Sequence, residues 1–330
     1  MDSIFYELDA PFTLTQKKKN LTQQMLGENE IFSETQYTVI STGTEIAAWE
    51  GKPPLRPCKV YPRLVGYCNL AKVIKVGNSV TEIHVGDYVL TDQSHRTAFI
   101  CDQSEVLLCI KEQDKQLLKK ITATYLYHLG YSALLAADYK PGHQIAIIGM
   151  GVLGITTASL SRVFGASPFI FTNQKMETPA FKKEYLGLNF MYELCGMDGV
   201  DIVINTSNKW EDHRLCLQLA RKGGSIVCLG FPGRAEEAPN FNPLDSQFFY
   251  DKQLTIKHCG YFPDVKVDPI DIRFTVKRNI KYLSSLIFQN RLDPLEILQK
   301  EFSWKKLDDA YTLLSARKEG SHTVLIDWGK

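Results

Sequence analysis

Three glycines with the spacing Gly-x-Gly-x-x-Gly stand at Gly149, Gly151 and Gly154. They directly follow an apolar run at 144–148 and open a segment with helical spacing at 152–164. In such a turn the first glycine allows a sharp bend, the second lets a pyrophosphate approach the backbone, and the third lets helix and strand pack closely. The sequence therefore predicts a dinucleotide-binding turn made of Gly149, Met150, Gly151, Val152, Leu153 and Gly154.

The residues after the next predicted strand discriminate between cofactors. An acid there accepts hydrogen bonds from the 2′-hydroxyl of the adenosine ribose and repels a 2′-phosphate. This chain has no acid at that place but Thr172, Asn173, Gln174 and Lys175. We therefore predict NADP as the cofactor, with NAD as the alternative, because a neutral pocket also accepts NAD. Further cofactor contacts are predicted at the ends of two later strands, from Thr206, Ser207, Gly230 and Phe231.

The elements that position this turn alternate along the chain. Apolar strands at 144–148, 169–172, 201–205 and 225–229 are separated by predicted helices at 152–164, near 179–186 and at 210–221. Continuous apolar strands between helices indicate a parallel sheet covered on both faces. The pattern predicts a doubly wound α/β domain.

The segments before and after this alternating region show different patterns of predicted strands and helices. Before the alternating region, short strands at 36–41, 70–76, 87–91 and 97–100 form a mostly β segment, which a helix at 121–138 ends. After it, helices are predicted at 275–289 and 303–318, and a last strand at 323–328 is too short to stand alone. We expect that strand to return to the sheet of the N-terminal domain.

Composition excludes several classes of function. The chain has 330 residues with 38 basic and 37 acidic side chains, so its net charge of +1 gives no field that attracts nucleic acid. No apolar run is long enough to span a bilayer, and the acidic opening does not resemble a signal peptide. Eight scattered cysteines without a Cys-x-x-Cys pair indicate reduced thiols. We expect a cytoplasmic protein of two domains that binds neither nucleic acid nor membrane.

Over nearly its whole length the chain resembles the medium-chain dehydrogenase/reductase superfamily, the alcohol-dehydrogenase-like enzymes. The matching stretches occur in the family's order, at 41–45, 49–51, 62–66, 85–89, 130–133, the glycine turn, 201–204, 223–224, 248–250 and 254–256. The resemblance implies a GroES-like, mostly β catalytic domain from residues 1–124 and 291–330. It also implies a Rossmann cofactor domain from residues 125–290, with the substrate cleft between the two.

The chain departs from the zinc-dependent members at the metal ligands. The positions that match those ligands hold Thr42, the pair Tyr67 and Cys68, and Thr124. A catalytic zinc needs three protein ligands, and Cys68 alone cannot hold one. The four-cysteine structural lobe of the family is also missing. The chain therefore resembles the zinc-free branch, and we predict no metal.

Without zinc, a positioned hydrogen-bond donor must handle the proton as the hydride moves. Tyr67 is the first candidate, because a cationic nicotinamide nearby would lower the pKa of its phenol. Thr44 matches a relay hydroxyl of the family, Thr42 fills the first ligand position, and His128 matches a side chain near the nicotinamide. Glu45 matches an acid that orients other groups. The alternative is that Tyr67 only fills the space of the absent metal.

The resemblance implies an oxidoreductase that interconverts a secondary alcohol and a ketone on a small metabolite. Reduction of an activated C=C bond, as in quinone and enoyl reductases of the superfamily, is the second hypothesis. A catalytically inactive, nucleotide-binding sensor is the third. The family also suggests a homodimer that forms through the sheet edge at 254–261.

Overall fold

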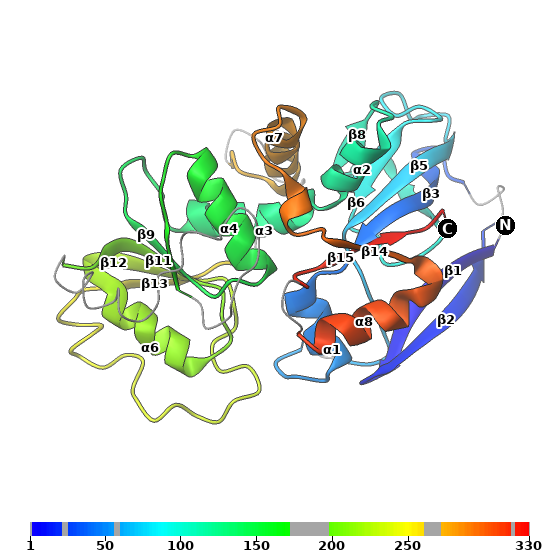
Figure 1. The fold of residues 1–330 in the computed structure, drawn as a ribbon. Coiled ribbons are helices and arrows are strands. Elements are labelled where there is room, and N and C mark those ends of the chain that lie inside the picture. Colours follow the sequence, from blue (N-terminus) through cyan, green and yellow to red (C-terminus); the bar gives the residue numbers. More distant parts are fainter. Residues whose placement is uncertain are drawn as a thin grey trace. The chain divides into compact units, whose positions relative to one another are not determined.

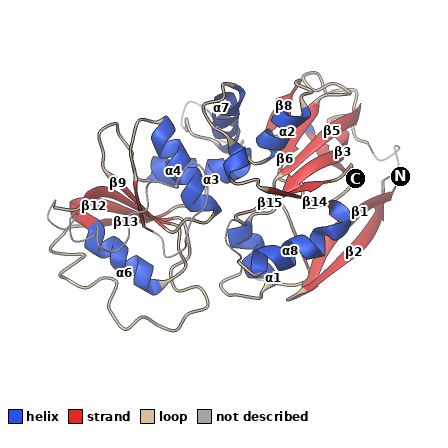
Figure 2. Cartoon of the chain, viewed as in Figure 1, coloured by secondary structure: helices blue, strands red, loops and turns tan. Residues whose placement is uncertain are grey.

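Strands from the first third and the last third of the chain build the larger sheet of the protein. The computed structural model describes residues 2–21, 26–55, 60–171, 198–260, 272–317 and 321–329. Their contacts divide the chain into a first unit, Met1–Tyr125 with Phe262–Lys330, and a second unit, Leu126–Tyr261. Figure 1 follows the chain through these units, and Figure 2 separates their strands from their helices.

The first unit contains a seven-stranded sheet in the order β14-β15-β3-β5-β6-β8, with β7 also paired to β3. Strand β15 lies antiparallel to β3, with Leu325 opposite Val39, so the C-terminal strand returns to the N-terminal sheet as predicted. The strands are β3 (Glu30–Val39), β5 (Asn69–Val76), β6 (Tyr88–Thr91), β7 (Ala98–Asp102), β8 (Leu108–Ile110), β14 (Lys300–Ser303) and β15 (Val324–Asp327).

A second, three-stranded sheet in the same unit was not predicted. Strands β1 (Asp2–Ala10) and β2 (Thr13–Asn20) form a hairpin, and β4 (Arg63–Leu64) pairs with β1. Between the sheets lies an aromatic core to which Trp49, Tyr311 and Trp328 contribute. The helices of the unit are the π-helical turn η2 (Thr42–Ile46), the short turns η3 (Gln103–Glu105), η4 (Pro294–Glu296) and η5 (Trp304–Lys306), and α1 (Ala47–Trp49), α2 (Lys115–Thr122), α7 (Val276–Phe288) and α8 (Leu307–Ser315).

The second unit is built on a parallel sheet in the order β10-β9-β11-β12-β13. Every residue of β9 is buried, as expected for a strand that is covered on both faces. The predicted α/β architecture is therefore confirmed. Its strands are β9 (Ile145–Ile148), β10 (Phe169–Phe171), β11 (Val200–Asn205), β12 (Ala220–Cys228) and β13 (Thr255–His258), and its helices include α4 (Val152–Val163) and α6 (Trp210–Leu219).

Several element boundaries differ from the sequence predictions. The helix expected at 121–138 is two helices, α2 and α3 (Thr124–Ala136), and the segment 303–318 is helical only from η5 to α8. Helix α6 ends at Leu219, because β12 already begins at Ala220. Helix α7 packs on α2 and β8 of the first unit, whereas the sequence analysis assigned it to the cofactor domain at 125–290. The helix expected near 179–186 lies outside the described residues.

Two sequence predictions, the absence of membrane-spanning segments and the reduced cysteines, can be compared with the described residues. None of the helices found there combines the length and the apolar character that crossing a membrane requires. Within the same ranges the cysteines are unpaired and mostly buried, namely Cys68, Cys101, Cys109, Cys216, Cys228 and Cys259.

Candidate functional site

The glycine turn joins β9 to α4 in the second unit. Gly149 has a φ of +87°, a conformation that side chains disfavour, so a glycine is needed at the bend. A Cβ on Gly154 would lie 2.0 Å from the carbonyl oxygen of Gly149, whereas a Cβ on Gly151 would meet nothing within 4 Å. The third glycine is therefore needed by the fold itself. The second is not, and its missing side chain leaves room for a ligand.

Groups at the carboxyl ends of the neighbouring strands complete this half of the site. The Thr206 hydroxyl donates to the carbonyl oxygens of Ile148 at 2.9 Å and Gly149 at 3.1 Å, so it holds the turn in place. Asn205 is fully buried, and no described group pairs with its Nδ2. Helix α4 starts at Gly151 without a side-chain cap. A buried amide donor and free helical N–H groups suit a bound phosphate.

The remaining predicted cofactor residues lie at the same edge of the sheet. The hydroxyl of Ser207 donates to Asp212, and the backbone N–H of Phe231 donates to Asn208 Oδ1 at 3.0 Å. A Cβ on Gly230 would lie 2.3 Å from the Ser207 carbonyl oxygen, so the loops after β11 and β12 pack tightly. The structure thus brings these residues together with the turn. Four others lie outside the described residues, namely Thr172, Asn173, Gln174 and Lys175.

A cluster of hydroxyl groups forms the candidate site of the first unit. Tyr67 donates to Ser41 Oγ, and the side chain of Thr44 is a further polar neighbour of the phenol. Ser41 and Thr44 belong to the start of η2, a π-helical turn of a kind often found at functional sites. Ser41 is buried and Thr44 is exposed, so the cluster has an inner and an outer end. Hereafter, "hydroxyl cluster" means Ser41, Thr44 and Tyr67.

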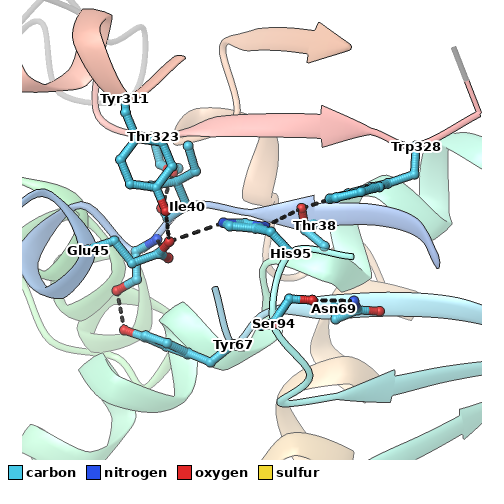
Figure 3. Close-up of polar contacts among 11 residues, drawn as sticks. Thr38, Ile40, Glu45, Tyr67, Asn69, Ser94, His95, Tyr311, Thr323 and Trp328 are labelled. Carbon is cyan, nitrogen blue, oxygen red and sulfur yellow. Dashed lines mark hydrogen bonds and ion pairs between the residues drawn. The ribbon is translucent and has the colours of Figure 1, made fainter. Parts of the chain in front are cut away.

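Glu45 anchors this cluster from inside the unit (Figure 3). Its side chain is 4% exposed and accepts three hydrogen bonds, from the backbone N–H of Ser41 at 2.7 Å, from the Tyr311 hydroxyl, and from His95 Nε2 at 3.1 Å. Hydrogen bonds to a charged carboxylate stabilise the ionised form. The three donors therefore compensate the charge of the buried Glu45.

The hydrogen bonds around His95 form a chain in which each donor is directed towards Glu45 (Figure 3). Trp328 Nε1 can only donate, and it donates to Thr38 Oγ1 at 2.9 Å. The Thr38 hydroxyl can then donate to His95 Nδ1, 2.8 Å away. With Nδ1 as acceptor, the proton of a neutral ring lies on Nε2 and points at Glu45. Trp328 also stacks on the His95 ring, which fixes the plane of the imidazole.

Burial changes the acidity of the groups beside the cluster. Enclosure of the phenol, together with the neighbouring Cys68 and Glu45, raises the pKa of Tyr67 well above its usual range, although the neighbouring side chains of Ser41 and Thr44 oppose this. The sequence analysis expected a lowered pKa at Tyr67. Burial therefore keeps the phenol protonated at neutral pH, as a neutral donor. Burial also raises the pKa of the Cys68 thiol.

The residues at the family's zinc-ligand positions do not fit a zinc ion. The Thr42 hydroxyl donates to the carbonyl oxygen of His322 at 3.0 Å, and the Thr124 hydroxyl to that of Ile121 at 2.6 Å. Tyr67 donates to Ser41, and the buried Cys68 is held as a neutral thiol. Zinc binds thiolates, imidazoles and carboxylates. In the described parts of the chain no three His, Cys, Asp or Glu side chains are grouped to hold a metal ion.

His128 lies in the second unit, on α3. It is buried, and this lowers the pKa of its imidazole to about 4. At neutral pH the ring is therefore uncharged and cannot act as a ready proton donor. Thr42, whose hydroxyl is turned to His322, is outside the cluster. Of the four predicted catalytic residues, the structure brings Tyr67 and Thr44 together.

Three functional candidates were missed by the sequence analysis. Ser41, His95 and Tyr311 all contact Glu45, and Ser41 also accepts from Tyr67. Ser41 lay within a motif already noted, but its neighbours were the ones examined. No sequence motif pointed to Tyr311 or His95. Their role is visible only once β7 is paired with β3 and α8 is packed on η2.

Curated relatives are dehydrogenases and reductases at low identity, while no protein-family model matches the chain. Sorbitol dehydrogenase of Bacillus subtilis is 25% identical over 195 residues, which is 56% of this chain and half of that enzyme. Probable D-xylulose reductase A of Aspergillus clavatus is 24% identical over 77% of this chain and 82% of its own length. A zinc-type alcohol dehydrogenase-like protein of Escherichia coli is 25% identical over 47% of each chain.

Solved structures share the fold over the whole chain. L-idonate 5-dehydrogenase of Escherichia coli aligns with a TM-score of 0.79 at 16% identity, covering 99% of both chains. An alcohol dehydrogenase of Escherichia coli CFT073, solved with NADH, aligns with a TM-score of 0.78 at 12% identity, again over 99% of both chains. In sequence the chain is similar to sorbitol dehydrogenase and D-xylulose reductase, and it shares the fold of L-idonate 5-dehydrogenase. A zinc-type protein is among the sequence relatives.

Proposed function

We propose that this chain is an NAD(P)-dependent oxidoreductase that interconverts a secondary alcohol and a ketone on a small polar metabolite. The observation that carries the proposal is the hydroxyl cluster anchored on buried Glu45, in which Tyr67 occupies a position that resembles a metal ligand of the family. The relatives, among them sorbitol dehydrogenase and D-xylulose reductase, support the alcohol and polyol class. The glycine turn and the uncapped start of α4 support the nucleotide cofactor.

The chain's own residues would handle the proton. A bound nicotinamide cofactor supplies the hydride to the carbonyl carbon, or accepts it in the reverse direction. On substrate binding the Tyr67 O–H turns from Ser41 Oγ to the carbonyl oxygen, and Tyr67 gives its proton to that oxygen as it gains negative charge. The exposed Thr44 hydroxyl, a polar neighbour of Tyr67, restores the proton from solvent. Glu45 fixes Ser41 and thereby the direction of the phenol.

Independence from zinc and a preference for NADP are the finer parts of the proposal. Zinc independence rests on the hydroxyl groups and the neutral thiol at the ligand positions. The NADP preference rests on the sequence 172–175, which carries Lys175 and no acid. A cytoplasmic location stays a prediction. We also propose that a second copy pairs along β13, the end strand of the described five-stranded sheet, which light scattering on the full chain would test.

An absorbance assay at 340 nm tests the activity, with NADPH and NADH against a panel of sugar ketones and alcohols. We expect NADPH oxidation with at least one ketone by protein that contains less than stoichiometric zinc. Tyr67→Phe should lower kcat by about 100-fold or more without weakening nucleotide binding. Tyr61→Phe is the matched control, because its hydroxyl donates to the carbonyl oxygen of Ala48 outside the cluster. Stoichiometric zinc, or no turnover with any substrate, would count against the proposal.

The raised pKa of Tyr67 favours a second candidate, reduction of an activated C=C bond. In that reaction the conjugated carbonyl of the substrate delocalises the developing negative charge. A proton donor of the protein therefore contributes less to the rate. An enone panel in the same assay separates the two candidates. An ene-reductase should turn over enones and lose much less than 100-fold on Tyr67→Phe. Nucleotide binding without turnover of either panel would indicate the inactive sensor.

A further inference from the structure

A pocket of about 380 Å³ opens within the first unit, apart from the hydroxyl cluster. Its walls come from the β1–β2 hairpin, β4 and β7, through side chains that include Phe5, Leu21, Leu64 and Ile100. The volume falls in the range of small-molecule pockets. Leu64 is 49% exposed, so an apolar side chain stands uncovered in this wall.

Arg96 brings a charge into the pocket that the described residues do not neutralise. It is partly buried, and its Nε and Nη2 donate to a single acceptor, Ser94 Oγ, at 2.9 Å and 2.5 Å. No described acid lies within 4 Å of its guanidinium, and burial lowers its pKa. A guanidinium taken out of water without a counter-charge is costly. An anion that enters the pocket would remove this cost.

Lys19 adds a second positive charge to the same pocket. It lies directly opposite Ser3 in the hairpin, and both side chains line the pocket. Two residues earlier on the same strand face, Lys17 forms ion pairs with Glu7 and Asp9. Lys19 has no such partner among the described residues. Acidic side chains of the hairpin therefore neutralise Lys17, whereas Lys19 at the pocket can pair with an anionic ligand.

One acid, Glu30, also lines the pocket. It accepts a hydrogen bond from the backbone N–H of Gly27 at 2.6 Å and makes no ion pair with Arg96 or Lys19. The lining therefore carries two positive charges and one negative charge beside several apolar side chains. This combination suits a ligand with an anionic head and a short apolar body, rather than a sugar or a cation.

We propose that this pocket binds a small organic anion. Its carboxylate or phosphate lies between Arg96 and Lys19, because a guanidinium recognises either group through paired hydrogen bonds. Its apolar body covers Phe5, Leu21 and Leu64. The pocket uses none of the residues assigned to the nucleotide or to the hydroxyl cluster, so this proposal stands or falls independently of the proposed function.

Methyl-resolved NMR titration of the full chain tests this site. The probes are hexanoate, hexyl phosphate and 1-hexanol, which share one apolar body and differ in the head group. The reporters are the methyl groups of Leu21, Leu64 and Ile100, with Ile148 of the second unit as reference. We expect at least one anion to shift the three reporters saturably and to bind at least tenfold more tightly than hexanol. The better of the two anions identifies the head group.

Charge removal locates the head group. Arg96→Met should weaken the preferred anion about tenfold or more, and Lys19→Met about threefold, with hexanol unchanged. Lys18→Met is the matched control, since it removes an exposed lysine from the opposite strand face and should change nothing. If Arg96→Met fails to fold, the anion affinity of Lys19→Met tests the proposal, because Lys19 is exposed and its substitution should not disturb folding. Equal binding of hexanol and both anions, or an affinity unaffected by these two variants, would overturn the proposal.

Discussion

The glycine turn and the hydroxyl cluster are built by opposite means. The turn occupies six consecutive residues and works through backbone groups and through side chains that are absent. The cluster and its anchor work through side chains from η2, α8 and the loops before β5 and β7. Substitutions that add atoms to the turn should therefore impair nucleotide binding. Substitutions that remove polar groups from the cluster or its anchor should impair catalysis or stability. Each of the following substitutions tests one side of this contrast.

The largest effect is expected from Gly154→Ala. The new Cβ would lie 2.0 Å from the Gly149 carbonyl oxygen, a backbone atom that cannot move without opening the turn. We expect a loss of about 3 kcal/mol or more in stability and no measurable nucleotide binding. Thermal unfolding and calorimetry with NADPH measure the two losses.

Gly151→Ala sharpens the same test. Its Cβ meets nothing within 4 Å, so stability should stay within about 0.5 kcal/mol of the unsubstituted protein. Nucleotide affinity should nevertheless fall at least tenfold, because the methyl group occupies the space assigned to the pyrophosphate. Unchanged affinity in Gly151→Ala would show that the ligand does not approach the backbone there.

Glu45→Gln removes a charge from the cluster's anchor while keeping its shape. The amide can accept at one position only, so its N–H₂ group faces donors from Tyr311 and His95. We expect a loss of about 2 to 4 kcal/mol in the free energy of unfolding, measured by urea denaturation. Glu50→Gln is the control, because that side chain pairs with the partly exposed Lys52. Similar losses in both variants would contradict the anchoring role.

The pH dependence of stability should come partly from His128, whose pKa burial lowers to about 4. The unfolded chain binds a proton near pH 6.5, while the folded chain does not until about pH 4. This contribution to stability is therefore intact above pH 6.5 and is lost as the pH falls towards 4. Between pH 7.5 and 5 the loss is about 2 kcal/mol. Denaturation at both pH values should show that His128→Gln reduces the difference, and an unreduced difference would assign it to other groups.

The contrast between the two regions also explains what could be predicted from the sequence. The parallel strands were predicted to within a few residues at most ends, because buried strands between helices carry a continuous apolar signal. The hairpin of β1 and β2 was missed. Its second strand carries Lys17, Lys18 and Lys19 and has no apolar face to detect. The break between α2 and α3 was also missed, since Ala123 gives no helix-stop signal.

The candidate site also has parts that could be predicted from the sequence and parts that could not. The glycine turn could be predicted because its residues are adjacent in sequence. Tyr67, Thr44 and Glu45 were found through family resemblance, but His95 and Tyr311 were not, because 50 and 266 residues separate them from Glu45. The pairing of β7 with β3 and the packing of α8 on η2 bring such distant side chains together. Sequence spacing cannot encode that proximity.

The smallest effect separates two threonines that are neighbours in the motif but not in the structure. Thr44 is exposed and is a polar neighbour of Tyr67, whereas Thr42 donates to the His322 carbonyl oxygen. Thr44→Val should lower kcat about tenfold with little change in stability, since it removes the proposed proton relay. Thr42→Val should cost about 1 kcal/mol of stability and leave kcat nearly unchanged. The reverse result would assign the proton to the position that matches the family's first metal ligand, and the cluster defined by Tyr67 would then be structural.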